Sequence, residues 1–233
     1  MSTTTSNSAF RQGVLAGLPF TVFAIPFATL FGVVATEAGL NIAQTMGFSV
    51  LVIAGASQFT AIQLMSENAP VWLTLAAALA VNLRMAMYSA SLQPHLGGLT
   101  FGKRALVAYC NVDQSFAVGM SKFEESPDMK LGDKFAFFMG SVVPVMPIWV
   151  AFTWIGAVAG TAIPEEWALD FAMPILFLAL VAPMLRTIAH VAAAVTSVVM
   201  ALLLASLPTG FGLLVAGILA MMVGAETERR LMR

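Results

Sequence analysis

Charged residues are rare inside the long apolar segments of this sequence, where Arg84 and Asp113 supply one cation and one anion. Carrying a guanidinium into hydrocarbon costs at least ~2.5–3.5 kcal/mol, so a chain keeps one there only with a partner or a task. Tyr88 follows Arg84 by four residues and therefore lies on the same face of a helix. We interpret Arg84, Tyr88 and Asp113 as groups that line one polar cavity. The alternative is a structural ion pair between Arg84 and Asp113 inside a helix bundle.

One cation and one anion at membrane depth suit a small zwitterion as ligand. Arginine binds a carboxylate through two parallel hydrogen bonds, while a carboxylate or freed backbone carbonyls accept an ammonium. An amino acid fits this description, and Ser57, Gln58 and Asn82 would add hydrogen-bonding groups. Alternatively, Ser57 and Gln58 only support a close helix crossing. Asp113 could also act as a proton carrier.

A hydrolase acting within the membrane is a second interpretation, with less support. Ser57 would be its nucleophile and His190 its base, but the stretch GASQF lacks the second glycine of a G-x-S-x-G turn. A structural or channel-forming subunit is a third interpretation. Cys110 is the only cysteine, and no cysteine or histidine pair has metal-site spacing, so we expect neither a metal nor a cofactor.

The composition indicates whether lipid or water surrounds the protein that holds these groups. Of 233 residues, 59% are hydrophobic and only 10% are charged. The mean hydropathy of +0.89 indicates an all-α, polytopic membrane protein. A net charge of −1 without a basic block argues against nucleic acid as a partner. We expect one integral membrane domain over residues 1–233, with a polar tail at 1–12 and a charged tail at 226–233.

Apolar segments long enough to cross a bilayer need about 20 helical residues. The sequence contains about eight of them, or seven if the two flanking Arg186 are one. They lie near residues 13–35, 42–65, 70–92, 104–121, 134–158, 167–185, 187–205 and 208–225.

The distribution of lysine and arginine predicts that both termini are cytoplasmic, because short cytoplasmic loops are enriched in these residues. In this arrangement the outer side holds only Lys103 and Arg104. The inner side holds Arg11, Lys122, Lys130, Lys134, Arg186, Arg229, Arg230 and Arg233.

Several of these segments contain residues that interrupt helices. Pro19 and Pro26 lie in the first, Gly55 in the second, and Pro144 with Pro147 in the fifth. Proline removes a backbone donor and crowds the preceding turn. Interrupted helices at membrane depth are tolerated only where protein or a water-filled cavity satisfies the backbone, and they commonly mark transporter binding sites.

Four stretches, in order along the chain, resemble the signature stretches of the AzlC-type branched-chain amino acid exporters. They are AGASQF at 54–59, NLRMAMYSASL at 82–92, NVDQSFAV at 111–118 and FAMPILFLAL at 171–180. The resemblance implies the large subunit of a two-component secondary exporter in the bacterial inner membrane, with a small AzlD-type membrane subunit as partner. It leaves open whether the chain also forms homo-oligomers.

The expected substrates of such an exporter are leucine, isoleucine, valine and sometimes methionine. The resemblance points to Ser57, Gln58, Arg84, Tyr88 and Asp113. The chain departs from the family pattern at two positions: Met85 stands where a histidine is frequent, and Gln114 where an acidic residue is frequent. Both departures remove a titratable group that proton coupling through these positions would need.

Overall fold

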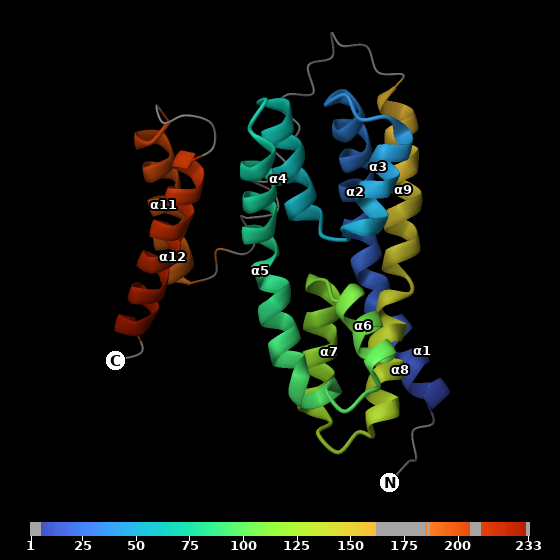
Figure 1. Cartoon of the computed structure of the whole chain (residues 1–233). Coiled ribbons are helices and arrows are strands. Elements are labelled where there is room, and N and C mark those ends of the chain that lie inside the picture. Colours follow the sequence, from blue (N-terminus) through green and yellow to red (C-terminus); the bar gives the residue numbers. More distant parts are fainter. Residues whose placement is uncertain (1–5, 162–184, 186, 206–210, 232–233) are drawn as a thin grey trace. The chain divides into compact units, whose positions relative to one another are not determined.

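The structure, a computed structural model, describes residues 6–161, 185, 187–205 and 211–231 (Figure 1). Within these ranges the regular secondary structure is helical, which confirms the all-α prediction. The helices are α1 (Ser6–Gly17), a short 3-10 helix η1 (Leu18–Phe20), α2 (Thr21–Glu37), α3 (Ile42–Leu51), α4 (Gly55–Ser66), α5 (Val71–Leu96), α6 (Phe101–Tyr109), α7 (Asp113–Glu125), α8 (Leu131–Val142), α9 (Val145–Gly160), α11 (Ile188–Leu203) and α12 (Phe211–Leu231).

The chain divides into two compact units. Unit 1 comprises Met1–Ile62 and Ala78–Ala162, and unit 2 comprises Gln63–Ala77 and Ile163–Arg233. In unit 2, α11 packs against α12. The predicted segment 167–185 and the stretch FAMPILFLAL lie outside the described residues, apart from Leu185.

Two long, interrupted helices pack along each other in unit 1. Ser6–Glu37 and Leu131–Gly160 are both long and apolar enough to cross a membrane, as is α5. Because α1 packs against α8 and α2 packs against α9, the two interrupted helices run parallel to each other (Figure 1). Their interruptions therefore lie side by side, and unit 1 has an α1–α8 end and an α2–α9 end.

Prolines mark both interruptions, as the sequence predicts. Pro19 lies in η1, and Pro144 is the N-cap residue of α9 after α8 has ended at Val142. Pro26 and Pro147 behave differently: Pro26 stays inside α2, and Pro147 lies in the first turn of α9, where the backbone donor it removes has no partner within the helix. Only one proline of each pair therefore interrupts its helix.

Glycines hold the two parallel helices close together. The sequences GVLAG in α1 and GAVAG in α9 are G-x-x-x-G motifs, which let helix backbones approach in membranes. A Cβ atom added to Gly13 would collide with the Phe137 carbonyl, and one added to Gly156 would collide with the Thr29 carbonyl.

The second apolar segment folds back on itself instead of crossing as one helix. Phe31 of α2 stacks on Phe48 of α3 with ring centroids 6.2 Å apart, and meets Phe59 of α4 edge-on at 5.6 Å. Both arms of the segment thus contact the same residue, on either side of the non-helical residues 52–54. We call α3 and α4 hairpin 1. The hydroxyls of Ser49 and Thr153, 3.0 Å apart, join it to α9.

The fourth segment forms a matching hairpin at the other end of unit 1. Its arms α6 and α7, which we call hairpin 2, both pack against α8, and α7 also contacts α1. With 9 and 13 residues, the arms are only about 14 and 20 Å long, less than the ~30 Å hydrocarbon core. Residues 104–121 therefore do not form the single crossing that the sequence suggested.

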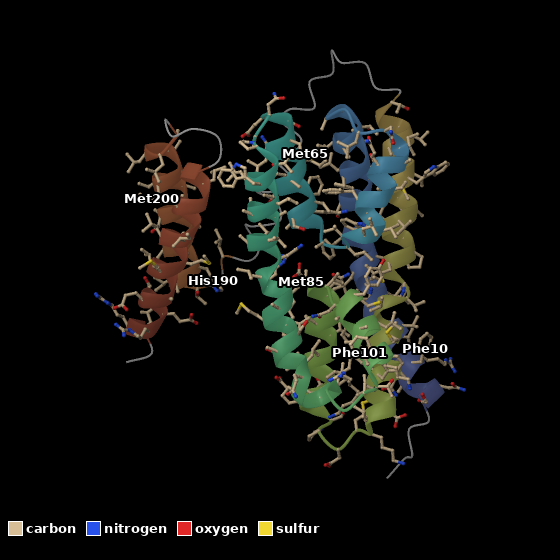
Figure 2. All side chains as sticks on the ribbon, viewed as in Figure 1. Phe10, Met65, Met85, Phe101, His190 and Met200 are labelled. Atoms are coloured by element: carbon tan, nitrogen blue, oxygen red, sulfur yellow. The ribbon has the colours of Figure 1, made fainter. Side chains whose placement is uncertain are left out.

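Because hairpin 2 folds back, Lys103 and Arg104 do not lie on the side that the sequence predicted. The ammonium group of Lys103 lies 5.2 Å from the ring centroid of Phe135 in the first turns of α8. Figure 2 shows Phe101, the first residue of α6, at the same end of unit 1 as Phe10 in α1. The prediction that Lys103 and Arg104 lie on the side opposite to Arg11 is therefore wrong.

We predict that Gly156→Val destabilises the protein by about 1–3 kcal/mol or more, because overpacking a tight helix contact forces the backbone to shift. Gly47→Ala is the matched control within a helix, since a Cβ atom there would meet nothing within 4 Å. The thermal stability of detergent-purified protein measures both effects. Equal stability of the two variants would contradict the proposed packing.

Candidate functional site

Arg84 lies near the middle of the longest uninterrupted helix of the described chain. It is 13 residues from Val71 and 12 from Leu96, the ends of α5, which corresponds to about 20 and 18 Å along the helix. A guanidinium at this depth cannot reach both a partner and the membrane surface by extending its side chain. Its charge must be compensated inside the protein.

Asp113 provides that compensation. Nη1 of Arg84 lies 3.1 Å from Oδ2 of Asp113, and their side chains are 29% and 50% exposed. The hydroxyl of Tyr88 donates a hydrogen bond to Oδ1 of Asp113 at 3.0 Å. Tyr88 stacks on Phe116, with ring centroids 4.1 Å apart. The three predicted residues Arg84, Tyr88 and Asp113 therefore form one cluster, and their charges are paired yet accessible.

The start of α7 fixes the position of Asp113. Asp113 is the first residue of α7, where the partial positive charge of the helix N-terminus favours a carboxylate. Ser115 holds the preceding turn: its hydroxyl accepts the Val112 N–H at 2.9 Å and lies 2.9 Å from the Cys110 carbonyl oxygen, to which it donates. This turn is the tip of hairpin 2.

The tips of the two hairpins contact each other. The hydroxyl of Tyr109, the last residue of α6, donates a 2.6 Å hydrogen bond to the carbonyl of Val50 near the end of α3. Within unit 1, α4 and α7 both begin at a hairpin tip, so two helix N-termini lie in this region. Such half-helix N-termini attract anionic groups of substrates in transporters. Tyr109 was not predicted as a site residue, because its role depends on a contact between segments.

Ser57 and Gln58 are fully buried within hairpin 1. The hydroxyl of Ser57, which is 1% exposed, donates to the Ala54 carbonyl at 2.9 Å. The side-chain amide of Gln58, which is 0% exposed, donates to the Phe48 carbonyl at 3.1 Å. These bonds tie the first turns of α4 to the tip and to α3, so they stabilise the hairpin.

The other predicted polar residues lie in different surroundings. Gly55 begins α4, where an added Cβ atom would lie 2.9 Å from the Trp149 ring. Asn82 precedes Arg84 by two residues on α5. His190 lies in unit 2, where its backbone N–H donates to Oγ1 of Thr187 at 3.2 Å. Among the described residues, no group of three or more His, Cys, Asp or Glu side chains could hold a metal ion.

Several buried polar atoms lack a hydrogen-bond partner in the part of the chain that the structure describes. An unpaired buried donor or acceptor costs about 1–3 kcal/mol, so each one is a candidate contact for a ligand. The atoms are Oε1 of Gln58, Oδ1 of Asn82, Nε of Arg84, Oδ1 of Asn111 and Nε1 of Trp149. For Arg84, this leaves one guanidinium donor unused beside the pair with Asp113.

Comparisons with known proteins are consistent with a membrane protein. The profile of a family described as AzlC protein matches residues 19–163. The chain is 29% identical over 178 residues to the inner membrane protein YgaZ of Escherichia coli (strain K12), covering 74% of this chain and 71% of that protein. It is 31% identical over 206 residues to a protein of Archaeoglobus fulgidus described as an uncharacterized membrane protein, covering 87% of each. No solved structure matches.

We predict that a double-mutant cycle on Arg84→Ala and Asp113→Ala gives a coupling energy of about 0.5–3 kcal/mol, because the two groups are in contact at membrane depth. The matched control is the Arg229–Glu226 pair, 2.8 Å long and on the exposed part of α12, for which a much smaller coupling energy is expected because solvent screens exposed charges. The thermal stability of the purified variants gives both values. Additive effects of the first pair would contradict the observed ion pair.

Proposed function

Since the chain belongs to the AzlC protein family, we propose that it is the large subunit of a secondary transporter that exports branched-chain amino acids across the bacterial inner membrane. The cluster of Arg84, Tyr88 and Asp113 carries this proposal. It combines a cation halfway along the membrane helix α5 with an anion at the start of α7, and both side chains are partly exposed. A zwitterion is the ligand whose charges match this pair.

The proposed substrate would separate the two charges of the cluster. Its carboxylate would bind the guanidinium of Arg84, where Nε lacks a protein partner, so that two parallel hydrogen bonds form. Its ammonium would replace Arg84 as the partner of Asp113, which keeps the hydrogen bond from Tyr88. Without substrate, Arg84 and Asp113 would neutralise each other's charge. The ion pair between them would break when substrate binds.

The proposed partner is a small AzlD-type membrane subunit, which the family resemblance suggests. The proposed orientation places the α1–α8 end of unit 1 in the cytoplasm. Hairpin 2 brings the first residues of α6 to this end, so the basic residues of the described part of unit 1, other than Arg84, lie towards one side. They are Arg11, Lys103, Arg104, Lys122, Lys130 and Lys134. Such an excess is typical of the cytoplasmic face.

We predict that Arg84→Lys and Asp113→Asn each lower leucine and valine efflux by roughly 10–100-fold, because a charge-assisted hydrogen bond is worth about 1.5–3 kcal/mol. Efflux is measured in cells that also express the small subunit, over a panel of amino acids. Glu226→Gln is the matched control, since it alters an exposed pair with Arg229 and should leave efflux unchanged. Wild-type efflux by both Arg84→Lys and Asp113→Asn would overturn the proposed site.

The proposed orientation predicts where single cysteines react in a variant that lacks Cys110. Gly102→Cys at the start of α6 and Asp128→Cys between α7 and α8 should react only with reagents that enter the cytoplasm. Ala38→Cys, after α2, should react with a membrane-impermeant maleimide added outside. If Gly102→Cys reacts like Ala38→Cys, hairpin 2 does not fold back.

A further inference from the structure

A separate pocket of about 210 Å³ lies between α5 and α6 of unit 1. Its walls are largely aliphatic and include Leu92, Leu96, Val107 and Ala108. For comparison, an apolar cavity of about 150 Å³ is large enough to bind benzene. The α5–α6 pocket can therefore hold a branched aliphatic side chain.

Asn111 is the most buried polar residue of the pocket lining. It is 3% exposed, its amide group donates to Oγ of Ser89 at 3.3 Å, and its Oδ1 has no hydrogen-bond partner among the described residues. Asn111 precedes Asp113 by two residues, and Ser89 follows Tyr88 directly. Two residues of the pocket lining are thus close in sequence to residues of the charged cluster, and Asn111 offers an unused acceptor that suits an ammonium group.

Arg104 is the charged residue of the pocket lining. It is exposed, three residues into α6, and forms no ion pair within the described part of the chain. From Arg104 to its last residue, Tyr109, α6 rises by about 7–8 Å, and Asn111 follows two residues later. An exposed guanidinium in the pocket lining attracts carboxylates and raises their local concentration.

We propose that the α5–α6 pocket is an access site, in which the aliphatic amino acid binds before it reaches Arg84 and Asp113. The aliphatic side chain lies against Leu92 and Val107, and the ammonium group lies towards Oδ1 of Asn111. This inference rests on the proposed function for the choice of substrate. A lipid tail is the competing occupant, but it would place a methyl end against an unpaired amide oxygen.

Cysteine protection tests the access site directly, without transport. Ala108 lines the pocket, while Ala105 is an exposed alanine of the same helix that does not. In protein lacking Cys110 and purified with its small subunit, millimolar leucine should slow maleimide labelling of Ala108→Cys several-fold and leave Ala105→Cys unchanged. Equal labelling of Ala108→Cys with and without leucine, as a lipid-filled pocket would give, overturns the proposal.

Two substitutions test the same site in cells: one fills the pocket, and the other removes its positive charge. Ala108→Phe should reduce leucine efflux several-fold, and Arg104→Gln should reduce it more at low than at high substrate concentration. Lys103→Gln is the matched control for Arg104, because Lys103 lies over the Phe135 ring and not in the pocket. Wild-type efflux by Ala108→Phe and Arg104→Gln overturns the access site, whereas wild-type efflux by Arg84→Lys and Asp113→Asn overturns the proposed function.

Discussion

The ion pair between Arg84 and Asp113 is the constraint to which the rest of unit 1 conforms. A guanidinium halfway along a 26-residue apolar helix requires an anion at the same depth. A continuous helix could carry that anion, but hairpin 2 also places the N-terminus of α7 at Asp113, where the helix dipole favours its negative charge. The turn before α7 therefore supplies both the carboxylate of Asp113 and the helix N-terminus whose partial positive charge stabilises it.

The parallel helices provide the frame that holds the two hairpins. Their glycines allow such close approach that side chains cannot enter the contact, which fixes the pair along its length. Each hairpin then attaches to one end of the frame: Ser49 of α3 to Thr153 of α9, and Gly119 of α7 against Phe138 of α8. Because each arm is short, both tips end within unit 1 and meet where Tyr109 reaches Val50.

The surroundings of the ion pair favour the proposed binding site over a structural bridge. A bridge sealed in a dry interface would have both partners buried and every donor used. Here the Asp113 side chain is half exposed, and Nε of Arg84 has no partner in the described chain. Met85 and Gln114 carry no charge, so the cluster contains one cation and one anion. A site with one cation and one anion suits a zwitterion, which has no net charge, better than a ligand that carries a net charge.

The sequence alone determined the membrane class, the helical fold and the residues of the cluster, because charges are costly in hydrocarbon and therefore stand out against apolar segments. It also located the helix breaks at Pro19 and Pro144. It could not show that two segments fold back, since a half-length hairpin and a full crossing have the same hydropathy. Only the tertiary structure decided that Lys103 shares an end with Arg11, and that Ser57 is buried while Asp113 is open, because both depend on contacts between distant segments.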